Sequence, residues 1–263
     1  MSHISYEVDD RVATITIDRP DKRNALAFAD LADLHGALGR AAGDDAVAAV
    51  ILTGAGGAFC AGTDLSDLAG TPEAERSGRG RGAGDNGPAS GPWPIVSCPK
   101  PVVAAVDGAA VGLGAELATQ CDVRIASTQA RFGWVFVRRG LVPDTGAGTF
   151  LLPRLVGPTA AARLLFSGEM IDAAEAHRLG LVTAVVEPGE LAAAAQAEAR
   201  RYLDVSPFAL ARTKRLLYSG MASSPGDHAR LTAALLQECF HSDDHREGVA
   251  AFLERRPARF TGR

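Results

Sequence analysis

The chain opens with two short β-rich runs, and a stretch of helical periodicity follows them. Residues 4–8 and 12–17 are rich in β-branched residues and are separated by a polar turn, which predicts a hairpin. Leu31, Leu34 and Leu38 then recur at the spacing of one helix face, so we expect an amphipathic helix there.

Two further apolar runs continue the pattern. Residues 47–52 predict a buried strand, and residues 102–106 predict another, which passes through a turn and two glycines into an apolar helix. Gly112 and Gly114 mark the entry to that helix, and Glu116 is the carboxylate on its first turn. Because strands and helices alternate along this part of the chain, we expect a layered α/β fold.

Shorter elements follow and then give way to helices alone. We expect strands at 122–126 and 181–186, an extended segment at 132–139, and helices at 145–155, 158–166 and 172–179. After Pro188 the pattern is helical only, at 189–203, 206–219, 225–240 and 243–254. We therefore divide the chain into a core, 1–187, that carries the site, and a helical C-terminal region, 188–263.

Residues 71–91 show no apolar period and are rich in Gly, Arg, Ser, Asp and Pro, which is typical of a mobile surface loop. The arginines of this loop could bind a phosphate group, and the alternative is that they are exposed to solvent without a ligand.

Composition narrows the classes of function. The formal net charge of −4 argues against nucleic acid or an anionic membrane as partner. The four cysteines have no paired spacing, the histidines form no metal-like cluster, and the N-terminus does not resemble a secretory signal. No long apolar segment is free of charge, so we expect a cytoplasmic protein without a metal site or a membrane span.

The chemistry centres on the strand-to-helix entry at Gly112. Glycines at a helix start leave backbone N–H groups pointing at whatever lies in front of them. Residues 57–65 form a second glycine-rich segment of the same kind, and we interpret the two as paired donors for a developing oxyanion. A dinucleotide site is a poor alternative, because the third glycine is missing and Glu116 would repel a pyrophosphate.

These motifs, in this order, resemble the enoyl-CoA hydratase/isomerase (crotonase) superfamily over essentially the whole chain. The segments that carry the resemblance are 19–26, 57–65, 108–117, 121–122, 171–174 and 247–252. The resemblance implies a spiral of ββα turns with a helical C-terminal trimerisation region. It also implies an acyl-CoA thioester as substrate and no cofactor apart from the coenzyme A that the substrate carries.

The resemblance also assigns residues. The oxyanion donors would be the amides of Thr63 and Leu113, with Glu116 at the position of one hydratase glutamate. The residues that would bind substrate or coenzyme A are Lys22, Arg23, Ala25, Leu26, Ala61, Gly62, Asp64, Leu65, Gly112, Gly114, Phe136, Phe252 and Arg255. Phe252 and Arg255 match positions that reach the coenzyme A of a neighbouring subunit, although ordinary packing for Phe252 and solvation for Arg255 are the alternatives.

The chain departs from the hydratase pattern at one position. Phe136 stands where hydratases carry a second glutamate, and Asp144 matches the catalytic aspartate of several family isomerases. The chain resembles the epoxyphenylacetyl-CoA isomerase branch most closely, so double-bond isomerisation is our first hypothesis. Asp144 as the N-cap of the next helix is an alternative role for that residue.

Two other functions remain open at this point. The first is ordinary enoyl-CoA hydration with Glu116 alone or with Asp144, and the second is a non-catalytic protein that binds CoA thioesters. Trp93, Trp134 and Phe136 are expected to shape the acyl pocket. The C-terminal helices carry more apolar stripe than one layer needs, and the resemblance implies that it is buried in a homotrimer or a dimer of trimers.

Overall fold

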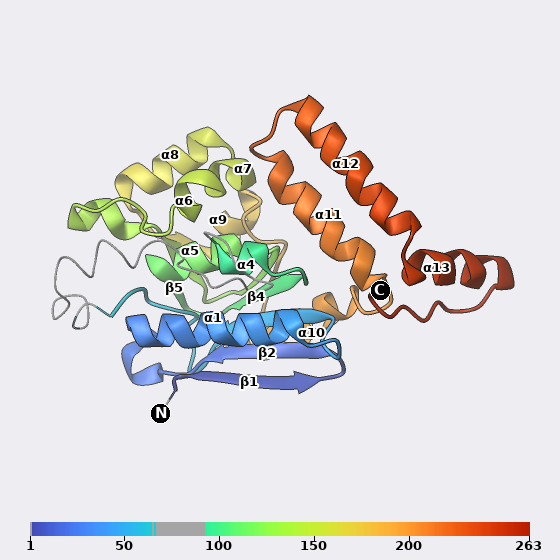
Figure 1. The fold of residues 1–263 in the computed structure, drawn as a ribbon. Helices are drawn as coiled ribbons and strands as arrows, with labels where there is room; N and C mark the ends of the chain where they lie inside the picture. The colour runs from blue at the N-terminus through green and yellow to red at the C-terminus, as the bar shows by residue number, and fades with distance from the viewer. Residues whose placement is uncertain (1, 65, 67–92) are drawn as a thin grey trace.

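The computed structural model describes residues 2–64, 66 and 93–263 (Figure 1). Leu65 and the predicted loop at 71–91 lie outside the described residues. The larger sheet has the strand order β1-β2-β3-β4-β6-β9, with β1 antiparallel to β2 and each later pair parallel. Its strands are β1 (Ile4–Asp9), β2 (Val12–Ile17), β3 (Ala49–Gly54), β4 (Val102–Val106), β6 (Val123–Ser127) and β9 (Ala184–Val186).

A smaller sheet lies beside the helix that carries Glu116. It has the order β5-β7-β8, formed by β5 (Ala109–Val111), β7 (Arg131–Gly133) and β8 (Ile171–Asp172). Helix α5 (Leu113–Gln120) follows β5 directly, and all of its residues are buried. The chain therefore has the α/β architecture that the sequence predicts.

Both faces of the larger sheet are covered, which explains why its strands are continuous apolar runs. Alternate residues such as Val50 and Leu52 pack into one core with α1 (Phe28–Gly43) and α5. Their neighbours Ala49 and Ile51 pack into a second core with α10 (Leu191–Arg200).

The remaining helices lie mostly where the apolar periodicity predicts them. They are α4 (Pro94–Ser97), α6 (Ala147–Phe150), α7 (Leu152–Val156), α8 (Pro158–Ser167), α9 (Ala173–Arg178), α11 (Pro207–Gly220), α12 (Pro225–Phe240) and α13 (Asp243–Glu254), with 3-10 turns η1 (Pro20–Lys22), η2 (Val135–Arg139) and η3 (Pro188–Glu190). No helix among the described residues is long and apolar enough to cross a membrane.

Two expectations about local structure are wrong. The predicted extended segment at 132–139 is a strand only as far as Gly133, after which η2 forms. Gly140, at φ 69°, closes that turn with its amide on the carbonyl of Phe136, a contact that an apolar run does not reveal. The single helix expected at 145–155 is split into α6 and α7, with Pro153 in the first turn of α7, where its missing N–H is tolerated.

Helix α11 is attached to the core through a buried ion pair. Nζ of Lys214 lies 2.6 Å from Oδ2 of Asp122, and the hydroxyl of Tyr218 donates to Oδ1 of the same carboxylate at 2.8 Å. Helices α12 and α13 continue away from the sheets (Figure 1). The assignment of 188–263 to oligomerisation stays a prediction.

Candidate active site

The segment 19–26 is held by one buried side chain, Asn24. Its Oδ1 accepts from the amide of Arg19 at 2.8 Å, and its Nδ2 donates to the carbonyls of Ala55 and Ala58 at 2.8 and 2.6 Å. Asn24 has a left-handed backbone, with φ 60°, which asparagine tolerates better than most residues. This anchoring leaves Lys22 exposed at the surface, where a solvent-borne ligand can reach it.

The next residues pair with the first predicted oxyanion segment. The amide of Leu26 donates to the carbonyl of Gly62, and the amide of Asp64 donates to the carbonyl of Leu26, both at 2.9 Å. Leu26 and Thr63 thus form a parallel bridge. In such a bridge the amide of Thr63 points away from Leu26, and it makes no hydrogen bond with the described part of the chain.

The second predicted segment lies against the first. Cys60 exchanges backbone hydrogen bonds with Ala109 and Val111, at 2.8 and 2.9 Å. A Cβ added to Gly62 would lie 3.0 Å from the carbonyl oxygen of Val111 and 3.8 Å from the amide nitrogen of Leu113. The amide of Leu113, at the start of α5, is likewise unpaired within the described residues, so two free amides occupy adjoining segments.

The close approach of these segments requires glycine. A Cβ on Gly114 would lie 2.0 Å from the carbonyl oxygen of Cys60, which is a clash with the backbone itself. The sequence pattern predicted small residues here, and this contact is the physical reason.

Glu116 lies on the first turn of α5 and has no exposed surface. Burial raises the pKa of its carboxyl to about 7, against the opposing effect of a hydrogen bond from the hydroxyl of Thr145. That hydroxyl donates to Oε2 at 2.5 Å, whereas Oε1 accepts no well-formed hydrogen bond within the described residues. A buried carboxyl with a pKa near neutrality can both take and give a proton under ordinary conditions.

The indole of Trp134 lies beside this carboxyl. A Cβ on Gly148 would lie 2.1 Å from Oε1 of Glu116 and 2.8 Å from Cδ1 of Trp134, so the carboxyl and the indole crowd the same glycine. Phe136 is buried, and a Cβ on Gly112 would lie 4.0 Å from its Cζ. The ring therefore borders the second oxyanion segment, as expected of a residue that lines the acyl pocket.

Asp144 does not cap the following helix, so the alternative role as N-cap is wrong. The N-cap of α6 is Gly146, and the amide of Ala147 in its first turn donates to the hydroxyl of Thr145 rather than to Asp144. Asp144 is solvent-exposed in the single chain, yet surrounding protein atoms raise the pKa of its carboxyl by desolvation. Its charge in turn raises the pKa values of Glu116 and Cys60, so the structure brings Asp144 to the same site as Glu116.

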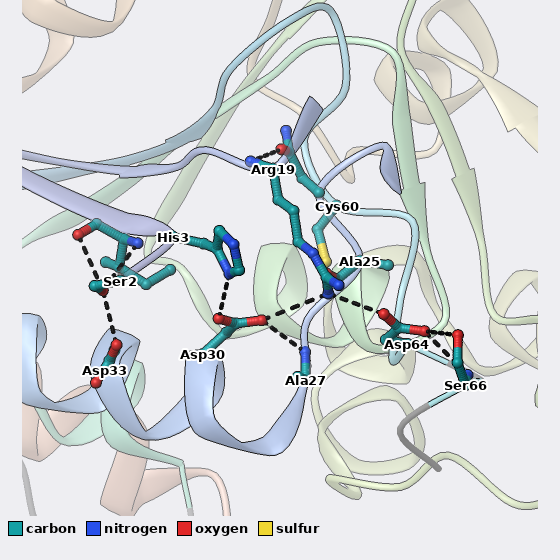
Figure 2. Close-up of polar contacts among 12 residues, drawn as sticks. Ser2, His3, Arg19, Ala25, Ala27, Asp30, Asp33, Cys60, Asp64 and Ser66 are labelled. Atoms are coloured by element: carbon teal, nitrogen blue, oxygen red, sulfur yellow. Dashed lines mark hydrogen bonds and ion pairs between the residues drawn. The ribbon is translucent and has the colours of Figure 1, made fainter. Parts of the chain in front are cut away.

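An ion-pair cluster that the sequence did not reveal holds the first oxyanion segment (Figure 2). Nη1 of Arg19 lies 2.9 Å from Oδ2 of Asp64 and 3.7 Å from Oδ2 of Asp30. Oδ1 of Asp64 accepts from the hydroxyl and the amide of Ser66, which lower the pKa of the Asp64 carboxyl to about 2. Asp64, predicted to bind substrate, is thus occupied by protein partners, and an Arg-to-Asp pairing across 45 residues of sequence leaves no local signal.

The predicted C-terminal contacts lie apart from this site in the single chain. Phe252, on α13, is 83% exposed, so the alternative in which it packs inward is wrong. Arg255 ends α13 in a left-handed conformation and is exposed to solvent. Figure 1 shows α13 distant from α5. Within the described ranges, no group of acidic, histidine and cysteine residues is arranged to hold a metal ion.

Comparison with known proteins gives a consistent result. The family model described as Enoyl-CoA hydratase/isomerase matches residues 7–263. A "Probable enoyl-CoA hydratase" of Rhodobacter capsulatus is 40% identical over 99% of this chain and 98% of its own length. The 1,2-epoxyphenylacetyl-CoA isomerase of Escherichia coli is 36% identical over 100% of both chains. The crystal structure of an enoyl-CoA hydratase from Bacillus anthracis matches 100% of both chains with a TM-score of 0.90 at 31% identity.

Proposed function

The chain belongs to the enoyl-CoA hydratase/isomerase family, and from that premise we propose that it shifts the double bond of an enoyl-CoA thioester rather than hydrating it. Coenzyme A is part of the substrate in this proposal, and the reaction needs no further cofactor. The observation that carries the proposal is the placement of two carboxyls with raised pKa values beside two unpaired backbone amides.

The amides of Thr63 and Leu113 would receive the thioester oxygen. When a base removes a proton from C2 of a 3-enoyl thioester, negative charge moves onto that oxygen. Backbone amides that already point at the oxygen stabilise this charge without reorganising. Return of a proton to C4 then gives the 2-enoyl thioester, with no net gain or loss of atoms.

Asp144 is the proposed carrier of this proton. A raised pKa makes its carboxylate a stronger base and its protonated form a donor that is available closer to neutral pH. Glu116 would assist from the buried side, either as a second proton carrier or by keeping the substrate carbon in place. The charge of Asp144 also raises the pKa of Glu116.

Phe136 supports isomerisation over hydration. Its buried ring borders the second oxyanion segment, at the position where the family's hydratases hold a carboxylate. An apolar wall there excludes an ordered water, so an enolate would meet a protonated carboxyl before it met a nucleophile.

Hydration with Glu116 is the second candidate, and one observation favours it. Oε1 of Glu116 is buried without a hydrogen-bond partner among the described residues, which is an environment in which a carboxyl can hold a water. Product analysis separates the two reactions, because hydration adds one water to the mass and isomerisation leaves the mass unchanged.

The deciding experiment uses 3-enoyl-CoA and crotonyl-CoA as substrates of the wild type and of Asp144→Asn. We expect the wild type to isomerise the first faster than it hydrates the second. Asp144→Asn should lower isomerisation by at least about 100-fold, the usual contribution of a positioned proton carrier, with thioester binding nearly unchanged. Asp204→Asn, at an exposed loop position, is the matched control. Normal isomerisation by Asp144→Asn would refute the proposal.

A further inference from the structure

The hydroxyl of Thr145 has one hydrogen-bond acceptor for its single proton among the described residues. Its oxygen accepts from the amide of Ala147 at 3.2 Å and donates to Oε2 of Glu116 at 2.5 Å. The structure records no other acceptor for this proton within the described residues. A threonine hydroxyl has one proton to give, so Oε2 is held as an acceptor.

The other oxygen of the same carboxyl has no hydrogen bond of good geometry. Oε1 of Glu116 is buried and unpaired among the described residues, although the backbone amides of Gly148 and Ala147 lie close enough to lower the pKa of the carboxyl. When Glu116 is protonated, its proton must therefore reside on Oε1, because Oε2 faces the proton of Thr145. The geometry distinguishes the two oxygens of one carboxyl.

Thr145 is itself held by a contact from a distant part of the chain. It lies in a bend with no regular secondary structure, between η2 and α6. Nε1 of Trp93, the residue before α4, donates to the carbonyl of Thr145 at 2.8 Å. The ring of Trp93 also contacts the ring of Phe150 on α6, with the centroids 5.2 Å apart. Helix α5 packs against both α4 and α6 (Figure 1).

We propose that Thr145 is a positioning residue that reserves Oε1 of Glu116 for proton exchange, and that Trp93 holds Thr145 in the required place. This inference rests on the proposed role of Glu116 as a proton-transfer group. It adds two residues to the site, neither of which touches the reacting atoms of the substrate.

The hydroxyl also has a predictable effect on titration. A hydrogen bond donated to a carboxylate favours the charged form, so the Thr145 hydroxyl lowers the pKa of Glu116 against the larger, opposite effect of burial. The charge of Asp144 acts on Glu116 as well, and it raises that pKa. Removal of the hydroxyl takes away one effect that lowers the pKa of Glu116, whereas burial and the charge of Asp144 still raise it. The pKa of Glu116 must therefore increase.

The test compares Thr145→Val, which keeps the shape and removes the donor, with Thr145→Ser, which keeps the donor. The carboxyl of Glu116 is titrated by ¹³C NMR in substrate-free protein labelled at glutamate, and Glu116→Gln assigns the resonance. We expect its pKa to be about one to two pH units higher in Thr145→Val, the effect of one hydrogen bond to a charged group. Thr145→Ser should titrate close to the wild type.

Kinetics then report on the consequence for turnover. The limb of the pH profile of kcat/KM that belongs to Glu116 should move upward in Thr145→Val by the same amount as the NMR titration. At pH 7, kcat should fall about tenfold or more, while KM for the thioester changes little. Trp93→Phe, which keeps an aromatic ring at this position and removes the donor to Thr145, should change both readouts in the same direction and by less.

Failure of this inference and failure of the proposed function are distinguishable. If Thr145→Val titrates Glu116 like the wild type, the positioning role is wrong, whatever the activity of the variant. If Glu116→Gln keeps full turnover, Glu116 transfers no proton, even where the NMR titration moves as expected. Should Thr145→Val not fold, Thr145→Ala removes the same hydroxyl without adding volume, and its titration decides the question.

Discussion

Two buried carboxylates, one in each half of the molecule, have opposite surroundings. Asp244, at the start of α13, is 2% exposed and accepts from the hydroxyl of Ser206 at 2.6 Å and from the amides of Thr261 and Gly262 at 2.8 and 3.0 Å. Glu116 on α5 is 0% exposed, and one of its oxygens has no hydrogen-bond partner among the described residues.

The difference indicates which carboxylate is structural and which is functional. A buried carboxylate that receives donors on both oxygens stabilises the segments that supply them, here the start of α11 and the C-terminus. A buried carboxyl with an unoccupied oxygen costs stability, and proteins retain such groups where they perform chemistry. Burial is nearly the same at both sites, so the hydrogen-bond partners separate the two residues.

The largest effect that we expect from this comparison is on turnover, in Glu116→Gln. Loss of a positioned proton carrier should lower kcat by roughly 100-fold to 10,000-fold, while the midpoint of denaturant unfolding stays near that of the wild type. Glutamine has the same shape and removes an ionisable group from a buried site. Steady-state kinetics and urea unfolding on the same preparation measure both quantities, and near-normal turnover would make Glu116 a structural residue.

The opposite outcome is expected for Asp244→Asn. Its amide nitrogen would face a donor where the carboxylate accepted one, so the free energy of unfolding should fall by about 1–3 kcal/mol. The neighbouring Asp243→Asn is the matched control, because Asp243 is exposed and pairs only at the surface with Arg246. Urea unfolding checks the difference. An Asp244→Asn protein as stable as Asp243→Asn would mean that the carboxylate on α13 is not structural.

The smallest effect on the single chain is expected at the apolar surface of α13. Phe252 and Leu253 are 83% and 74% exposed, so their replacement by serine should leave the stability of the isolated fold within about 0.5 kcal/mol. If these side chains form the predicted contact between subunits, the double variant should lose the trimer or dimer of trimers that we expect of the wild type. Light scattering at micromolar concentration measures this, and a monomeric wild type would remove the basis of the prediction.

Helices and strands could be predicted from the sequence wherever a single apolar periodicity continues over the whole element. The hairpin, α1, β4 and the four helices after Pro188 lie close to their predicted ranges, because each has a long apolar pattern. The segment 132–139 was misjudged because an alternating apolar run suits a strand and a buried 3-10 turn equally. Gly140 ends the 3-10 turn with a left-handed backbone, at φ 69°, and the apolar pattern before it does not reveal that turn.

For the site, the chain alone determined the kinds of group and their order. The glycines at 112 and 114 and the carboxylate of Glu116 were assigned from one short motif, and Phe136 was assigned from a second motif further along the chain. Such motifs are readable because a strand-to-helix turn restricts which residue types can occupy it.

Tertiary structure alone decided which of these groups is free to react. Three contacts at the site join residues that are 29 to 52 positions apart in the sequence. They are the ion pair of Arg19 with Asp64, the hydrogen bond of Trp93 with Thr145, and the hydrogen bond of Thr145 with one oxygen of Glu116. Hydrogen bonds of this kind depend on distances of about 3 Å and on direction, which the packing of sheets and helices sets and no local pattern encodes. The sequence therefore determined the fold and the candidate acid, whereas the packing around that acid determined its pKa and its unpaired oxygen.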